Sequence, residues 1–201
     1  MSRRRIGAIA LVPVLAVATI LAIGLAPGAS HTDAHGATAT RQAFHDAMRK
    51  LWEDHIVWTR QFIVSAATQT DPLPDLGPTR DRLLANQAHI GDAIKPFYGD
   101  EAGDALTALL REHIVGAADL IAAAKSGDAD EIKLASDAWY ANADEIAAFL
   151  SEANPRNWPL EMLEAHMRSH LDLTLEEALA RLEGRYPADI EAYDKVHADI
   201  L

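Results

Sequence analysis

The sequence predicts an all-α protein: an up-down four-helix bundle with additional C-terminal helices, preceded by an N-terminal signal or anchor helix. Alanine, leucine, glutamate and aspartate abound, and β-branched runs are few, which favours helices. Long segments carry apolar residues at alternating steps of four and three, the spacing of one buried helix face. The connections between these segments are short, which favours antiparallel neighbours.

The first 39 residues predict export. Arg3, Arg4 and Arg5 precede an uncharged, mostly apolar run over residues 6–26. This run is long for the core of a signal peptide and long enough to span a bilayer, so a cleaved signal peptide and a retained membrane anchor both stay open. In either case the remainder is expected outside the cytoplasm, extracellular or in the cell envelope. Residues 27–39 are small and polar and predict a flexible linker, which places the helical domain at 40–201.

Charge and cysteine content exclude several classes of function. The formal net charge is −12, and such a surface repels phosphate backbones, so no nucleic-acid partner is expected. The chain has no cysteine, which excludes disulfides, thiolate metal sites and cysteine nucleophiles. It also has no Gly-rich phosphate loop, no Gly-x-Ser-x-Gly motif and no His-Glu-x-x-His motif. The sequence therefore favours a binding protein over an enzyme.

Four long helices are expected first, each with a recognisable end. The first spans about 40–69 and ends at a proline-rich loop over 71–78. The second runs from about 79 to the Pro96–Gly99 stretch, and the third covers about 100–125. Ser126-Gly127 is a helix stop, and Asp128 with Glu131 forms an acidic capping box that starts the fourth helix, which Asn154-Pro155 ends.

The C-terminal part predicts further helices. Pro159 opens a helix, and Thr174 with Glu177 forms a second capping box that predicts a break or a kink around Asp172. A short helix then reaches about Gly184, and a last helix begins at Pro187 with an apolar stripe that still continues at Leu201. Such a stripe would face a protein partner or a second copy in a homo-oligomer.

Three histidines occupy positions of the buried helix faces where leucine is expected. Each lies near the middle of its segment: His55, His113 and His170. Burying an imidazole costs free energy unless the ring finds a partner. Gln87 and Asn142 fall at similar depth on two other helices, so the sequence predicts one polar layer. His166 lies one helical turn before His170, a spacing that lets two imidazoles chelate one metal ion.

Two interpretations of this layer stay open. In the first, the bundle core holds a metal ion through His55, His113, His166 and His170, with Asn142, Gln87 and Tyr140 orienting the ligands. Imidazole suits Zn or Cu, and haem held by two of these histidines is a second cofactor choice. In the second, the layer is a buried hydrogen-bonded network of a structural or interaction module that sets helix register. A hydrolytic enzyme using a metal-activated water is a third expectation.

Several stretches also carry a likeness to known proteins. They are LWEDH at 51–55 with WTR at 58–60, NQ at 86–87 with PFYG at 96–99, and WYANADEI at 139–146. Together they resemble an uncharacterised family of small bacterial helical-bundle proteins over most of residues 44–200. Relatives carry enzyme names such as glycosyltransferase or acetylglutamate kinase. The chain is too short for a glycosyltransferase fold and lacks a kinase phosphate site, so the resemblance implies a helical fold and no activity.

Overall fold

The computed structural model describes residues 31–201, and these residues are all-α, with six helices and no strand. The helices are α1 (His31–Ala66), α2 (Leu76–Tyr98), α3 (Asp100–Ser126), α4 (Ala129–Ala153), α5 (Leu160–Leu182) and α6 (Tyr186–Ile200). The predicted signal or anchor run over 6–26 lies outside the described residues. Among the helices that are described, none combines the length and the apolar character needed to cross a membrane.

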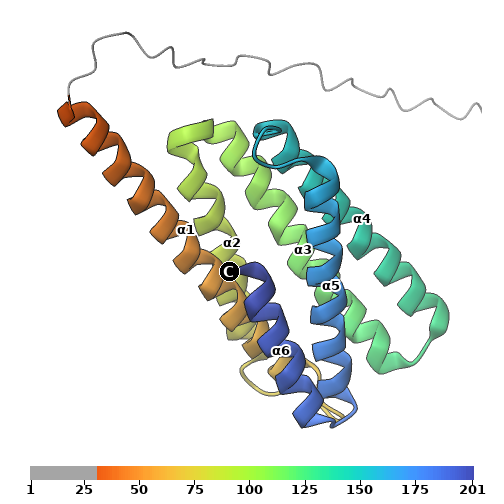
Figure 1. Ribbon diagram of the computed structural model, residues 1–201. Coiled ribbons are helices and arrows are strands. Elements are labelled where there is room, and N and C mark those ends of the chain that lie inside the picture. Colours follow the sequence, from red (N-terminus) through yellow and green to blue (C-terminus); the bar gives the residue numbers. More distant parts are fainter. Residues whose placement is uncertain (1–30) are drawn as a thin grey trace, which may run out of the picture. The chain divides into compact units, whose positions relative to one another are not determined.

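Residues 39–201 pack as one helical bundle, which confirms the predicted all-α class. Each helix from α2 to α5 packs against the next one in the chain, and α3 also contacts α5. Successive helices run in opposite directions, so α1, α3 and α5 point the same way (Figure 1). The lower core joins α1 to three other helices, because Phe62 and Ile63 pack against Leu83, Ile114 and Ala178.

Two predicted helix boundaries are confirmed in atomic detail. Gly127 ends α3 in the left-handed conformation with φ of +74°, which a residue with a Cβ adopts at a cost. Asp128 then caps α4, because its Oδ1 accepts hydrogen bonds from the backbone N–H groups of Asp130 and Glu131 at 2.9 and 3.1 Å. The sharp turn fixes α4 antiparallel to α3.

Two other predictions about the helices are wrong. Helix α1 begins at His31, so residues 31–39 are helical where a flexible linker was expected. Three alanines in this stretch favour helix despite its glycine. Helix α5 runs without a break through Asp172 to Leu182. Thr174 does not cap a new helix, because its hydroxyl donates to the carbonyl of His170 one turn earlier, at 2.7 Å.

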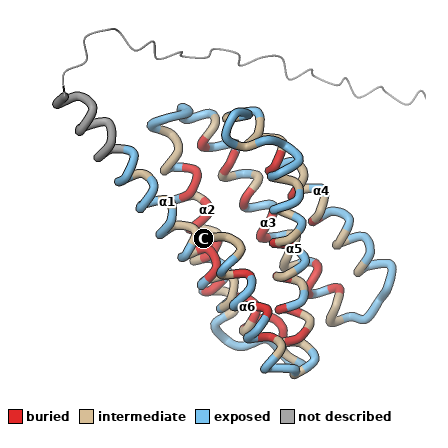
Figure 2. The backbone as a smooth tube through the Cα atoms, in the orientation of Figure 1, coloured by how far each residue is buried: buried red, intermediate tan, exposed pale blue. Residues whose placement is uncertain are grey.

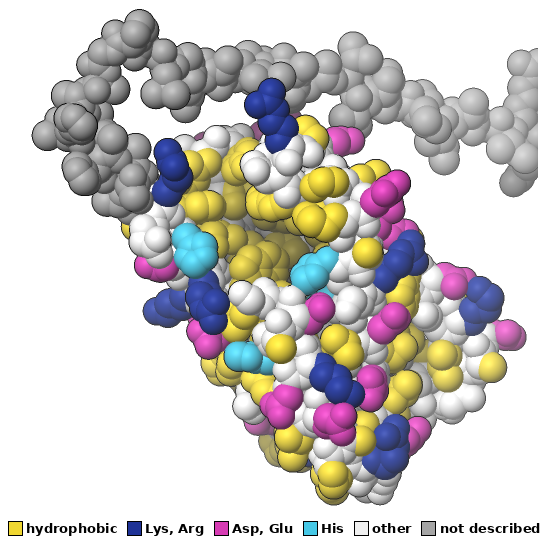
Figure 3. Space-filling view, in the orientation of Figure 1, with side chains coloured by type: hydrophobic (Ala, Val, Ile, Leu, Met, Phe, Trp, Pro, Cys, Tyr) yellow, Lys and Arg dark blue, Asp and Glu magenta, His cyan; other side chains and the backbone are white. Residues whose placement is uncertain are grey.

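Buried residues line the inner faces of the helices, as Figure 2 shows. The surface is not uniformly closed. In Figure 3 a hollow lined by hydrophobic side chains opens between α1 and α5, beyond the C-terminal end of α6. Large apolar side chains near the helix ends are partly exposed, among them Phe97 at the end of α2 and Met162 at the start of α5. The open side of the bundle is therefore the side on which α6 stops.

Candidate functional site

The three histidines predicted from the helix pattern meet inside the bundle. His55 on α1, His113 on α3 and His170 on α5 are 3%, 4% and 6% exposed. The ring centroid of His170 lies 6.1 Å from that of His55 and 6.3 Å from that of His113. Three parallel helices therefore place three imidazoles at one level, with His170 between the other two. We call these three residues the histidine layer.

Asn142 on α4 fixes the proton of His113. The Nδ2 of Asn142 donates to the backbone carbonyl of Leu109 at 3.2 Å, so its Oδ1 faces the histidine. That oxygen lies 2.9 Å from His113 Nδ1, which must then carry the hydrogen and donate it. His113 is left with an unprotonated Nε2, whose lone pair is free to act as an acceptor or a metal ligand.

Gln87 on α2 holds His55 in a different way. The Nε2 of Gln87 lies 3.1 Å from His55 Nδ1, 2.9 Å from the carbonyl of Leu83 and 3.2 Å from Asn86 Oδ1. An amide nitrogen has two hydrogens, so it cannot serve all three acceptors at once. The Oε1 of Gln87 is buried and has no hydrogen-bond partner. In this arrangement His55 accepts at Nδ1 and carries its proton on Nε2.

His170 has the least satisfied ring of the three. Its Nδ1 is buried and makes no hydrogen bond. An unpaired buried polar atom costs roughly 1–3 kcal/mol, so this nitrogen is a point where a ligand could add stability. Two tryptophans pack against the layer. Trp52 meets His55 edge-on, with 5.6 Å between the ring centroids, and the ring centroids of Trp139 and His113 are 5.4 Å apart.

All three imidazoles are held in the neutral form. Burial lowers the pKa of His55 to about 3, assisted by the nearby His113, and lowers the pKa of His113 to about 4. Burial, then the neighbouring His55 and His113, also bring the pKa of His170 well below its ordinary value. A neutral imidazole is the form that binds a metal ion, because the protonated ring has no free lone pair.

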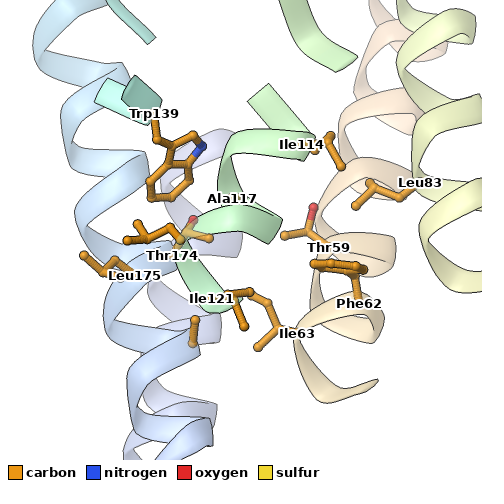
Figure 4. Close-up of a pocket in the computed structure, with 12 residues that line it drawn as sticks. Thr59, Phe62, Ile63, Leu83, Ile114, Ala117, Ile121, Trp139, Thr174 and Leu175 are labelled. Carbon is orange, nitrogen blue, oxygen red and sulfur yellow. The ribbon is translucent and has the colours of Figure 1, made fainter. Parts of the chain in front are cut away.

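A small cavity lies one helical turn below the layer. Thr59, Ala117 and Thr174, each four residues after one of the three histidines, line it together with Trp139 (Figure 4). The space open to the centre of a water molecule is about 20 Å³, enough for a single water. The Oγ1 of Thr59 is buried without a partner, whereas Thr174 uses its hydroxyl within α5.

Two residues expected at the site make their polar contacts elsewhere. His166 is nearly half exposed, and its Nδ1 lies 4.0 Å from Asp199 Oδ2 on α6. Tyr140 follows Trp139 on α4 and therefore points in another direction, where its hydroxyl donates to Asp172. Among the side chains that the structure describes, from residue 41 onward, no three histidine, aspartate or glutamate residues are close enough together to hold a metal ion.

The sequence did not predict a buried ionic cluster that lies below the histidine layer. Arg60 on α1 donates to Glu177 on α5 at 2.9 Å and to both carboxylate oxygens of Asp189 on α6, through Nη2 at 3.0 Å. Glu177 and Asp189 are almost fully buried. Burial raises the pKa of Glu177 to about 7 although Arg60 opposes the shift. The signal was present, because His170, Thr174 and Glu177 continue the steps of four and three.

Comparison of the chain with protein-family models, with curated proteins and with solved structures finds no match. Membership in the family that the sequence resembles stays a prediction.

Proposed function

We propose that the protein is an exported helical-bundle protein that binds one transition-metal ion through His55, His113 and His170. The observation that carries the proposal is the convergence of three neutral, buried imidazoles from three different helices at one level. A bundle that needed only stability would fill these positions with apolar side chains, which leave no polar group unsatisfied. The unpartnered nitrogen of His170 supports the same conclusion.

The surroundings of the rings suit this role to different degrees. His113 has the arrangement expected of a ligand, because an amide oxygen accepts its Nδ1 hydrogen and leaves Nε2 free. To bind through Nε2, His55 needs its proton on Nδ1. The unpartnered Oε1 of Gln87 can accept a hydrogen bond from that Nδ1–H if the amide turns over. Gln87 and Asn142 are thus proposed as the residues that orient two of the three ligands.

The distances between the rings require a modest closure on binding. Around a tetrahedral ion with metal–nitrogen bonds of about 2.0–2.1 Å, ring centroids lie roughly 5 Å apart. The ring of His170 lies 6.1 Å from that of His55 and 6.3 Å from that of His113, so each of these two separations must shorten by about 1 Å. All three side chains must therefore reorient about their side-chain torsions when the ion binds.

Zn and Cu ions are the proposed ligands, since imidazole binds both strongly. Met167 packs between two parts of the core near Leu171 and offers a soft sulfur that favours copper. The cavity beside the layer has room for the centre of about one water molecule, so we do not extend the proposal to haem. Neither do we extend it to catalysis.

A structural role is the second candidate, and the hydrogen bonding of Gln87 favours it. Its amide donates toward His55 instead of accepting from it, which is the arrangement of a closed polar network. In that case the layer would set the register of α1, α3 and α5, and the exposed Ile190 of α6 would meet a partner or a second copy of the chain.

Metal titration of the untagged full chain separates the two candidates. We expect one equivalent of Cu²⁺ or Zn²⁺ to bind and, at one hundred times its dissociation constant, to raise the stability by about 2.7 kcal/mol. His113→Leu should abolish that increase, whereas His89→Gln, an exposed histidine on α2, should not change it. Equal increases in the wild type and in His113→Leu, or none in either, would leave the structural role as the better account.

A further inference from the structure

A histidine–carboxylate pair lies one turn above the histidine layer, at the surface. His166 on α5 precedes His170 by four residues, and its Nδ1 is 4.0 Å from Asp199 Oδ2 on the last turn of α6. Ser169 orients this carboxylate by donating to its other oxygen, Oδ1, at 3.2 Å. The pair therefore joins the helix that carries the central histidine to the end of α6.

The carboxylate of Asp199 is incompletely satisfied. Its Oδ2 is buried and makes no hydrogen bond. A buried carboxylate oxygen without a donor is costly, and a cation beside it removes that cost. Imidazole and carboxylate together bind divalent ions such as Zn²⁺ and Cu²⁺. Ligand atoms around a tetrahedral ion lie roughly 3.3 Å apart, so closure by less than 1 Å brings this pair to bonding geometry.

The pair and the layer are connected along one helix face. Residues four apart on a helix are neighbours, and helical side chains lean toward the N-terminus, so the His170 ring leans toward the level of His166. The two rings are close enough that His166 contributes to lowering the pKa of His170. This end of the bundle is also the one where the surface is hollowed between α1 and α5 (Figure 3).

We infer that His166 and Asp199 form a surface site that captures a divalent metal ion and passes it to His170. The inference rests on the proposed function, because it supplies the entry route to the histidine layer. The ion arrives with water ligands, and replacement of these waters by the imidazole of His170 transfers it inward with no change of oxidation state. His166 then governs the rate of loading, while His55, His113 and His170 govern the affinity.

The rate of copper loading, monitored by tryptophan fluorescence, tests whether His166 governs loading while the three buried histidines govern affinity. Trp52 and Trp139 lie against His55 and His113, so Cu²⁺ in the layer should quench both indoles. With the full chain and Cu²⁺ below saturation, His166→Gln and Asp199→Asn should each slow quenching at least tenfold. Their equilibrium titration midpoints should stay within about threefold of the wild type.

The opposite flank of α6 offers a matched control. His197 Nε2 lies 3.9 Å from Glu53 Oε1, a pair of the same chemistry between α6 and α1. His197→Gln and Glu53→Gln should leave the loading rate unchanged. Equal slowing in these control variants, or unchanged rates in Asp199→Asn, would overturn the inference. So would a large loss of equilibrium affinity in His166→Gln, because His166 would then be a ligand of the buried ion.

The His113→Leu variant separates failure of the capture site from failure of the proposed function. In that variant, calorimetry with Zn²⁺ should still detect one weak site, and adding Asp199→Asn should remove it. Absence of this weak site, in a protein whose wild type loads copper, rejects the capture site alone. If the weak site is present and the wild type shows no quenching, the buried metal site is rejected and the surface site stands.

Discussion

The Nδ1 of His113 donates a hydrogen bond of 2.9 Å to the Oδ1 of Asn142, across the interface of α3 and α4. The direction of this bond follows from the other end of the amide, which donates to the carbonyl of Leu109. One asparagine thus fixes both the orientation of a buried imidazole and the position of its proton. Trp139 strengthens the same contact by donating to the carbonyl of His113 at 3.1 Å.

Replacing Asn142 by leucine should therefore affect stability and metal binding together. The buried N–H of His113 loses its acceptor, so the free energy of unfolding should fall by about 1–3 kcal/mol. Metal affinity should fall by roughly 10–100-fold, the usual effect of removing a partner of a ligating histidine. Urea unfolding and copper titration measure the two effects. Glu145→Leu, at an exposed position of α4, is the control and should change stability by less than about 0.5 kcal/mol.

Acid should destabilise the protein through the histidine layer. The folded pKa values, about 3 for His55 and about 4 for His113, lie below the ordinary 6.5, so the unfolded chain binds more protons below that pH. Stability is present above pH 6.5 and is lost as the pH falls toward 4, by about 1.4 kcal/mol per pH unit for each histidine. Glu177 offsets the contribution of about one histidine between pH 7 and 4.5. Because its folded pKa is raised, the folded protein takes up a proton there that the unfolded chain does not bind.

Urea unfolding between pH 7.5 and 5 checks this slope. His113→Gln should reduce the slope by the contribution of about one proton, whereas the exposed His89→Gln should leave it unchanged. A wild-type stability that stays constant from pH 6.5 to 5, with no difference between the two variants, contradicts neutral burial of the rings.

The layer could be found from sequence because it depends on local spacing. Steps of four and three place His55, His113 and His170 on buried faces, and similar helix lengths bring them to one level. The same steps lead from His170 through Thr174 to Glu177. The Thr–Glu spacing also matches a capping box, so the pattern alone does not decide between a new helix start and a continuing buried face. The hydrogen bond from Thr174 to the His170 carbonyl decides it.

The ionic cluster and the capture pair depend on contacts between distant parts of the chain. Arg60 reaches Asp189 across 129 residues, and no local pattern reports which charged side chain meets which. His166 lies on the same helix face as His170 and was expected beside it. The exposure of the His166 side chain depends on how far α6 extends over α5. That extent is set by helix packing and cannot be derived from the spacing of residues along α5.

Thr59→Val should stabilise the protein. The hydroxyl of Thr59 is buried at the cavity without a hydrogen-bond partner, and valine keeps the shape and the branching at Cβ. Removing an unsatisfied hydroxyl should raise the free energy of unfolding by about 1 kcal/mol. Thr174→Val is the matched control on the same cavity, and it should not stabilise, because the Thr174 hydroxyl already donates to His170. Thermal unfolding of both variants measures the difference, and destabilisation by Thr59→Val would indicate a bound water in the cavity.

Glu177→Gln should change stability in a pH-dependent way. Burial raises the folded pKa of Glu177 to about 7 from an ordinary 4.5. The stability that this proton uptake contributes is therefore fully present below pH 4.5 and is lost as the pH rises through 7. Glutamine stays neutral at every pH, so the variant should gain on the wild type by roughly 2–3 kcal/mol between pH 5 and pH 8.5.

Glu176→Gln is the control for this pH dependence, since Glu176 is the adjacent residue on α5 and is half exposed beside Lys195 at 4.0 Å. Its stability relative to the wild type should be nearly the same at pH 5 and pH 8.5. Urea unfolding at both pH values gives the comparison. A Glu177→Gln difference that does not vary with pH would mean that the glutamate stays ionised beside Arg60 throughout, and that Arg60 outweighs burial in setting its charge.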